Sequence, residues 1–206
     1  MKRGRLFVIA APSGAGKTSL VKALLANAPQ LRVSISHTTR RKRPTEEDGR
    51  EYHFVTVPEF EALIARGELL EHARVFGNFY GTSRAFVDKE LGAGHDVVLE
   101  IDWQGAQQVR ARMPECISIF ILPPSRAALA QRLARRATDT TDVIARRLAD
   151  SVADMSHYRE FGYVVVNDDF YQAVADLRSV VAGQGEDFRS DRRGLKALLV
   201  ELLAAP

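Results

Sequence analysis

The sequence predicts an α/β fold in which helices cover both faces of a doubly wound, parallel sheet. Nearly continuous apolar runs at 97–102, 117–122 and 163–166 are typical of strands buried on both faces of such a sheet. Helical patterns separate these runs, and strand–helix alternation is the arrangement of a doubly wound sheet. The stretch 11–18 is a glycine-containing loop between an apolar run at 6–10 and a helical pattern. Ligands of these sheets bind at the carboxyl ends of the strands, where this loop lies.

The first half of the chain is predicted to contain four strands and two helices. The strands are expected at 6–10, 31–36, 52–55 and 69–76. The first helix follows the glycine-containing loop and stops before 27–30. Pro58 suits the first turn of the second helix, which Gly67 ends. Gly77 and Asn78 then turn the chain.

The second half alternates more regularly. We expect strands at 97–102, 117–122 and 163–166, and helices at 84–91, 105–113, 142–161, 171–182 and 193–203. A further helix carries Leu129 and Leu133, and Ser125 is placed to cap it. The two prolines at 123–124 end the strand before it.

The stretch from about 34 to 82 differs from its flanks, because it has short strands and one helix instead of the longer alternation. It contains a basic run at 37–44 and an acidic turn at 45–49. We interpret this stretch as an inserted lobe. The predicted division is a core of residues 1–35 and 83–206 around a lobe of residues 36–82.

Composition narrows the class of protein. A chain of 206 residues with 46% hydrophobic residues can bury one sizeable core. With Cys116 as its one cysteine, it has neither an internal disulfide nor a multi-cysteine zinc site. The first apolar run is too short for a signal peptide, and no run reaches the ~20 residues of a membrane span. We therefore expect a cytoplasmic protein without a membrane partner. The net charge of +3 permits anionic ligands, but exposed aromatics are not interleaved with the basic residues, so no nucleic-acid partner is expected.

The loop at 11–18 has the composition of a phosphate-binding loop. Gly14 and Gly16 leave room for a polyphosphate to approach backbone N–H groups at a helix N-terminus. Lys17 can reach the outer phosphates, and the Thr18 hydroxyl can face a magnesium ion. The alternative is an ordinary strand-to-helix turn capped by Ser13.

A second anion site is expected in the inserted lobe. Arg40 and Arg43 carry planar guanidinium groups that suit phosphate oxygens, and Tyr52 and Tyr80 can add phenolic hydrogen bonds. The alternative for the arginines is a solvated basic loop or a nucleic-acid contact.

Two further polar residues of this lobe suit guanine. The Glu71 carboxylate can accept hydrogen bonds from the ring N–H and the amine of guanine, which adenine cannot offer, and the Thr82 hydroxyl can donate to O6.

An ordered set of motifs resembles the guanylate kinases, which are P-loop nucleoside monophosphate kinases. The similarity runs from Leu6 to about Ala182 and is carried by 36–40 with Arg43, 49–55, 77–82, 99–105, 123–125 and 166–168. The resemblance implies a P-loop NTPase core, an inserted lobe for the nucleoside monophosphate, and a helical lid at about 126–150.

The resemblance also implies roles for individual residues. Guanine would be held by Ser36, Glu71, Thr82 and Asp102, and the GMP phosphate by Arg40, Arg43, Tyr52 and Tyr80. ATP would be bound by Ala11, Pro12, Ser13, Gly14, Ala15, Gly16, Lys17 and Thr18, with Arg132 at the phosphates and Asn167 near the adenine. Catalysis would rest on Lys17, Arg40, Arg136 and Arg147, with the choice between Arg135 and Arg136 as the lid arginine left open.

Three positions depart from the family pattern. Ala11 replaces a glycine, Thr82 stands where many members have serine, and Ala137 follows the lid arginine in place of glycine. The Thr82 hydroxyl and the Gly16–Lys17 pair are retained, so we expect both nucleotides to bind. The change at Ala137 is expected to stiffen the lid hinge.

The expected reaction is Mg²⁺-dependent, in-line transfer of the γ-phosphoryl group of ATP to GMP, giving ADP and GDP. Thr18 and Glu100 would bind the metal, partly through water; the alternative for Glu100 is a capping or ion-paired carboxylate. The alternative function is a catalytically inactive, guanylate-kinase-like module that binds proteins. The sequence leaves open whether deoxy-GMP is used, whether the chain is a monomer or a homo-oligomer, and what residues 183–206 do.

Overall fold

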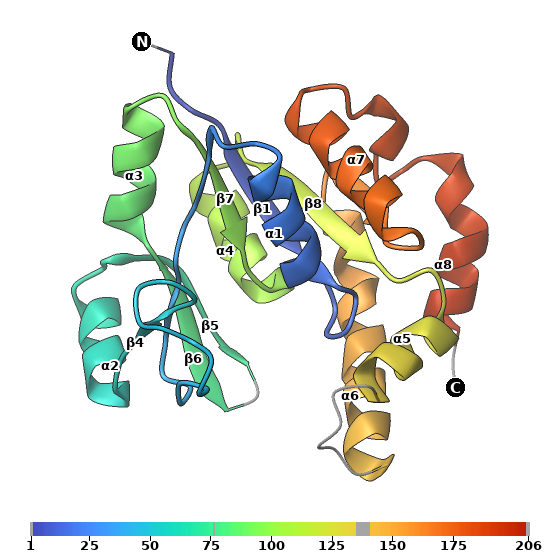
Figure 1. Cartoon of the computed structure of the whole chain (residues 1–206), viewed down its shortest axis with the longest axis horizontal. Helices are drawn as coiled ribbons and strands as arrows, with labels where there is room; N and C mark the ends of the chain where they lie inside the picture. Colours follow the sequence, from blue (N-terminus) through green and yellow to red (C-terminus); the bar gives the residue numbers. More distant parts are fainter. Residues whose placement is uncertain (1, 76, 135–140, 205–206) are drawn as a thin grey trace. The chain divides into compact units, whose positions relative to one another are not determined.

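The computed structural model describes residues 2–75, 77–134 and 141–204, and for 141–146 the backbone alone (Figure 1). The chain forms two compact units. One comprises residues 1–8 and 29–116, and the other residues 9–28 and 117–206. The chain passes between them inside the first strand, β1 (Leu6–Ala10).

A five-stranded sheet confirms the predicted fold class. Its strand order is β2 (Leu31–Val33), β7 (Asp96–Glu100), β1, β8 (Ile117–Leu122) and β9 (Tyr163–Val166). β2 pairs with β7, and β8 with β9, both in parallel. All five residues of β1 are buried. This burial explains the continuous apolar runs, because a strand covered on both faces has no polar side.

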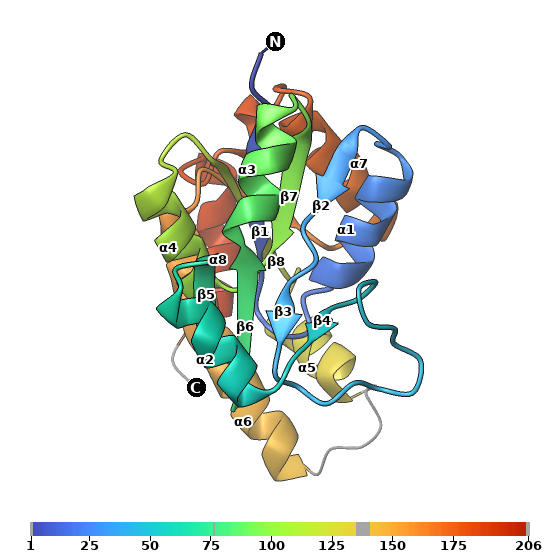
Figure 2. The same cartoon turned by 90° about the vertical axis from the view of Figure 1, so that its left-hand side faces the viewer.

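The first unit also holds a four-stranded sheet in the order β4 (His53–Phe54), β3 (His37–Thr38), β6 (Asn78–Ser83) and β5 (Leu69–Val75). β5 and β6 form an antiparallel hairpin, and α2 (Val57–Ala65) packs on β5 (Figure 2). Thr56 and Glu59 form a capping box at the start of α2. The unit is completed by α3 (Arg84–Gly92) and α4 (Trp103–Arg112).

The second unit surrounds β8 and β9 with helices. α1 (Lys17–Ala26) lies beside α7 (Phe170–Val181), and α5 (Arg126–Ala134) contacts α6 (Thr141–Met155) (Figure 1). Its core includes Phe120 and Phe161, whose rings lie 4.9 Å apart. None of the helices in the described part of the chain has the length and apolar character needed to cross a membrane.

The segment after α7 follows the edge of the sheet. It contains η2 (Glu186–Phe188), η3 (Arg193–Leu195) and α8 (Lys196–Leu203). Arg189 forms an antiparallel bridge with Tyr163 of β9, and Arg192 donates from Nη1 to the Val164 carbonyl at 2.8 Å. Residues 183–192 therefore satisfy backbone groups of an edge strand.

Several predicted boundaries were wrong. The strand predicted at 97–102 ends at Glu100, because the Asp102 carboxylate accepts a hydrogen bond from Gly105 N at 2.7 Å and starts α4 at Trp103. The strand predicted at 31–36 ends at Val33.

The helix predicted at 142–161 ends at Met155 and continues as a 3₁₀ helix, η1 (Ser156–Glu160). Tyr158 and Phe161, both buried, are three residues apart, a spacing that suits either kind of helix. The predicted helix at 193–203 likewise consists of η3 followed by α8.

Candidate active site

The loop after β1 is shaped by two glycines of the second unit. Gly14 and Gly16 have φ angles of +87° and +93°, which favour glycine, and Ala15 N donates to the Pro12 carbonyl at 3.2 Å. Gly16 is the N-cap of α1 and provides no capping side chain. A helix start of this kind is suited to binding an anion.

Side chains from three later elements hold the loop. Asn167, at the end of β9, donates from Nδ2 to Ala15 O at 2.7 Å, and a Cβ at Gly16 would lie 2.5 Å from that nitrogen. Arg132 of α5 donates to Ala15 O at 3.4 Å and to Asn167 O at 2.9 Å. Ser151 of α6 donates to Ser13 O at 3.1 Å. The carbonyls of Ser13 and Ala15 therefore have side-chain partners from later parts of the chain.

A cavity of about 200 Å³ opens beside this loop. Its lining consists of Gly16, Ser19, Arg132, Asn167, Asp168 and Phe170. The structure thus brings together three residues that the sequence assigned to ATP binding, and it adds Ser19, Asp168 and Phe170. Phe170 begins α7 four residues after β9 ends at Val166, so its position shortly after an apolar run was the available signal.

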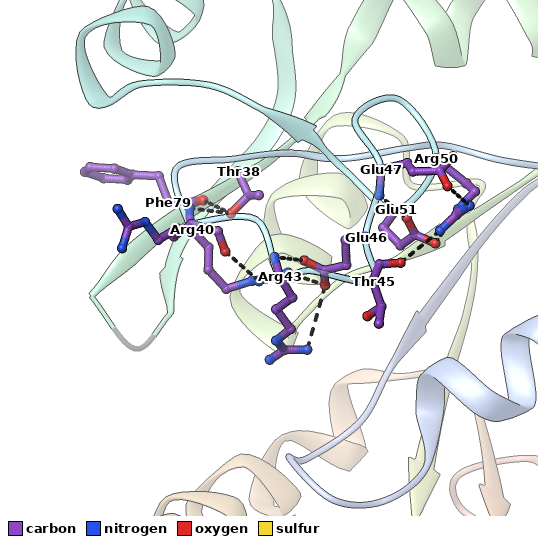
Figure 3. Close-up of polar contacts among 10 residues, drawn as sticks. Thr38, Arg40, Arg43, Thr45, Glu46, Glu47, Arg50, Glu51 and Phe79 are labelled. Carbon is purple, nitrogen blue, oxygen red and sulfur yellow. Dashed lines mark hydrogen bonds and ion pairs between the residues drawn. The ribbon is translucent and has the colours of Figure 1, made fainter. Parts of the chain in front are cut away.

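In the first unit, an ion-pair cluster organises the basic run of the lobe (Figure 3). Arg40 Nη2 lies 2.7 Å from Glu46 Oε1, and Arg43 N donates to Glu46 Oε2 at 2.8 Å. The hydrogen bond between Arg40 and Glu46 raises the pKa of Arg40 and lowers the pKa of Glu46 below its ordinary value. The Arg43 side chain is 68% exposed, with Nη1 3.8 Å from Glu46 Oε1. Sequence reasoning missed Glu46, which looked like part of an acidic turn.

The Arg40 guanidinium also lies against aromatic rings. Its central carbon is 5.4 Å from the centroid of the Tyr52 ring and 5.7 Å from that of Phe54. The rings of Tyr52 and Tyr80 lie 5.8 Å apart. Burial, and secondly the charge of Glu100, raise the pKa of Tyr52 to about 12. The Tyr52 hydroxyl therefore keeps its proton at neutral pH and can donate a hydrogen bond.

Two buried polar side chains face each other across the β5–β6 hairpin. Glu71 pairs with Thr82 in register, and the Thr82 hydroxyl donates to Glu71 Oε1 at 2.6 Å. Their exposed fractions are 2% and 0%. A methyl group at Gly105 would overlap Glu71 Oε2, so the carboxylate abuts the first turn of α4. The structure thus brings together the two residues that the sequence predicted to recognise guanine.

In the part of the chain that it describes, the structure does not bring the remaining predicted site residues together as it does Glu71 and Thr82. Ser36 O accepts from His53 N at 2.9 Å. Lys17 and Thr18 begin α1 in the second unit, whereas Glu100 ends β7 in the first. Arg147 is half-buried on α6.

The lid prediction is only partly covered by the structure. Arg135, Arg136 and Ala137 lie outside the described residues. Among the residues that are described, no three or more His, Cys, Asp or Glu side chains form a metal-binding group.

The Glu46–Arg40 pair predicts a pH-dependent stability. Glu46→Gln removes a charge-assisted hydrogen bond, which should lower the free energy of unfolding at pH 7 by about 1–3 kcal/mol. Since the pKa of Glu46 is lowered from 4.5 in the folded protein, this contribution is present above that value and is lost as the pH falls below it. Urea unfolding of parent and variant at pH 7 and pH 4 measures the difference, which should narrow at the lower pH.

The control for this prediction is Glu47→Gln. Glu47 is 68% exposed and pairs with Arg50, which is 52% exposed. Such a surface pair contributes roughly 0–1 kcal/mol. A Glu46→Gln effect of the same size at both pH values would contradict the prediction.

The comparisons with known proteins agree on one family. The guanylate kinase family model matches residues 3–184. The guanylate kinase of Shewanella denitrificans is 55% identical over 203 residues, covering 98% of both proteins, and that of Dechloromonas aromatica is 56% identical over 200 residues, covering 97% of this chain and 99% of that protein. The crystal structure of guanylate kinase from Anaplasma phagocytophilum has a TM-score of 0.73 at 33% identity, covering 97% of this chain and 95% of that chain. The chain therefore belongs to the guanylate kinase family.

Proposed function

We propose that this chain transfers the γ-phosphoryl group of ATP to GMP, giving ADP and GDP. It is an enzyme, a nucleoside monophosphate kinase, and its relatives named guanylate kinase match it over nearly the whole chain. The observation that carries the proposal is the buried Glu71–Thr82 pair, at 2.6 Å, in a lobe that also contains the Arg40 cluster. A buried carboxylate suits the two donors of guanine and rejects adenine.

We assign ATP to the loop at 11–18 and the adjoining cavity. The glycine N-cap of α1 leaves backbone N–H groups for the phosphates, and Lys17 neutralises the outer ones. Arg132 and Asn167 line the cavity, where Phe170 offers an apolar wall to the base. Since Arg132 already binds the Ala15 carbonyl, it is placed to hold the loop as well as the nucleotide.

We assign GMP to the lobe of residues 36–82 together with Asp102. Arg40, Arg43, Tyr52 and Tyr80 would bind the phosphate, and Ser36, Glu71, Thr82 and Asp102 the base. The Thr82 hydroxyl donates to Glu71 in the structure, so donation to guanine O6 requires that hydroxyl to rotate. Gly105 N occupies Asp102 Oδ1, so Asp102 would bind guanine through Oδ2.

The chemistry needs alignment and charge neutralisation more than covalent help. The acceptor phosphate has to lie in line with the γ-phosphate, with water excluded so that ATP is not hydrolysed. Lys17 and Arg40 supply positive charge to the two nucleotides, and we assign Arg136 and Arg147 of the lid to the charge that develops during transfer. Closure of the lobe and of the lid at 126–150 would exclude water.

Mg²⁺ is the metal that these residues fit. The Thr18 hydroxyl and the Glu100 carboxylate are oxygen ligands, which Mg²⁺ prefers, and Mg²⁺ usually takes its remaining ligands from water and substrate phosphates. The ion would neutralise phosphate charge. Thr18 is exposed at the start of α1, and Glu100 ends a strand.

We place the enzyme in the cytoplasm, with ATP and GMP as its small-molecule partners and with no nucleic-acid or membrane partner. The alternative of an inactive, protein-binding module is not favoured. The chain retains Gly14, Gly16 and Lys17, and the relatives named above bear the name of the active enzyme.

ADP release from ATP and Mg²⁺, measured with GMP, deoxy-GMP, AMP, CMP and UMP in turn, tests the function. We expect kcat/KM for GMP to exceed that for AMP at least about 1,000-fold, because a site built to hydrogen-bond one base leaves buried groups unpaired with another. EDTA should abolish the release. A protein that released no ADP with any of the five monophosphates would favour the binding module.

Lys17→Ala tests the donor site. Losing this cation should lower kcat at least about 100-fold while leaving the circular dichroism spectrum unchanged. Lys22→Ala is the matched control, since Lys22 is exposed on the same helix. A Lys17→Ala enzyme with near-parent turnover would remove the proposed mechanism.

Glu71→Gln tests base recognition. The amide can accept only one of guanine's two hydrogen bonds, so kcat/KM for GMP should fall about 10- to 100-fold while KM for ATP stays within about twofold. Glu68→Gln is the control, because Glu68 is exposed and lies directly before β5. An unchanged ratio of GMP to AMP activity would argue against Glu71 as the base-reading residue.

A further inference from the structure

Strand β5, which carries Glu71, lies at the end of the four-strand order β4-β3-β6-β5. It pairs with β6 on one side, and α4 packs against it within the same unit. An edge strand has a row of backbone N–H and C=O groups that need other partners. Here α4 supplies them through side chains.

Gln108 of α4 binds the backbone of one β5 residue twice. His72 N donates to Gln108 Oε1 at 3.2 Å, and Gln108 Nε2 donates to His72 O at 2.6 Å. The side-chain amide thereby takes the place of a peptide group on a neighbouring strand. His72 directly follows Glu71, so this double hydrogen bond holds the chain beside the base-reading carboxylate.

Two more residues of the same helix face act on β5. Arg112 Nη1 donates to the carbonyls of Leu69, at 3.4 Å, and of Leu70. Gly105 leaves the space that Glu71 Oε2 fills. Positions 105, 108 and 112 are spaced by three and four residues, which places them on one face of a helix.

These contacts flank an irregularity in the hairpin. The β5–β6 register shifts between Leu69 and Glu71, where Leu69 pairs with Ser83 and Glu71 with Thr82. A bulge interrupts the ladder, and a slip by one residue would turn Glu71 to the other face of the sheet. Arg112 binds the bulged residue Leu70, and Gln108 binds the residue after Glu71. The register that places Glu71 opposite Thr82 is thus held from the α4 side.

We propose that Gln108 and Arg112 are positioning residues for guanine recognition, which lock the bulged strand β5 so that the Glu71 carboxylate faces the base. The inference rests on the proposed function, because it assigns these residues to GMP specificity. Neither side chain has to touch the nucleotide. Their loss should impair GMP binding while leaving ATP binding and the transfer step intact.

Gln108→Met tests the inference, because methionine keeps the length of the side chain and its helix propensity but removes both hydrogen bonds. We expect KM for GMP and its calorimetric Kd to rise about tenfold, with kcat and KM for ATP within about twofold of the parent. The ratio of GMP to AMP activity should fall similarly. Arg112→Met should show the same pattern. Gln107→Met, at an exposed position of the same helix, is the matched control.

A second measurement tests directly whether Gln108 holds the backbone of β5. Amide hydrogen exchange at His72, without nucleotide, should become about tenfold faster in Gln108→Met and stay at the parent rate in Gln107→Met. All measurements are made at a temperature where melting curves show every variant folded. Hydrogen exchange and GMP binding can be measured without turnover. A parent protein that released no ADP with GMP would therefore contradict the proposed function but leave the positioning role of Gln108 testable. A parent-like Kd for GMP despite faster exchange at His72, or an equal loss of GMP and ATP binding, would overturn the inference.

Discussion

The burial of the Glu71 carboxylate is the constraint on which the proposed GMP-binding lobe depends. Glu71 is 2% exposed, and a carboxylate on so buried a residue is costly unless hydrogen bonds stabilise it. Thr82 provides one at 2.6 Å, and the bare backbone of Gly105 lets the carboxylate approach the start of α4. The hairpin register, the bulge and the side chains of α4 are all arranged around this one group. Under the proposed assignment, a base that lacks two adjacent donors would leave the carboxylate without the two hydrogen bonds that guanine supplies, which favours GMP over AMP.

The loop at 11–18, to which we assign ATP, is held by contacts from the protein itself. Its carbonyls are bound by Asn167, Arg132 and Ser151, all from elements far along the chain. These contacts hold the loop without a nucleotide, so binding of ATP there, as we propose, would require less ordering. The N-cap glycine of α1, by contrast, leaves the helix start for an anion.

Much of this architecture could be predicted from the sequence. β1 and β8 have the predicted bounds, because doubly buried strands require continuous apolar runs. Glu71 and Thr82 were both predicted as base-reading residues, and the structure places them opposite each other. The capping role of Asp102 could not be separated from a strand-end acid, since aspartate is common at both positions.

The residues that sequence reasoning missed act through three-dimensional contacts. Glu46 lies in a turn whose composition indicates a solvated acidic loop, and its pairing with Arg40 depends on how that turn folds back. Gln108 has no sequence signature, because an amide that binds a strand edge looks like any other polar residue on a helix. The bulge likewise depends on the register between two strands, which the apolar pattern of one strand does not fix.

The Glu46–Arg40 pair has a consequence for how firmly an anion is held. Arg40 already has a counter-ion at 2.7 Å, so the phosphate that we propose it binds would compete with Glu46 for the guanidinium. The free energy of phosphate binding would then be the difference between the energies of two ion pairs. It would be smaller than the binding free energy at an arginine that has only water as its partner. Small stray anions would gain little from this competition, whereas a nucleotide with further contacts through its base would gain enough to displace Glu46. Under the proposed assignment, Glu46 would take the guanidinium back on release of the product, so this internal carboxylate would compete with the ligand and shorten the lifetime of the bound state.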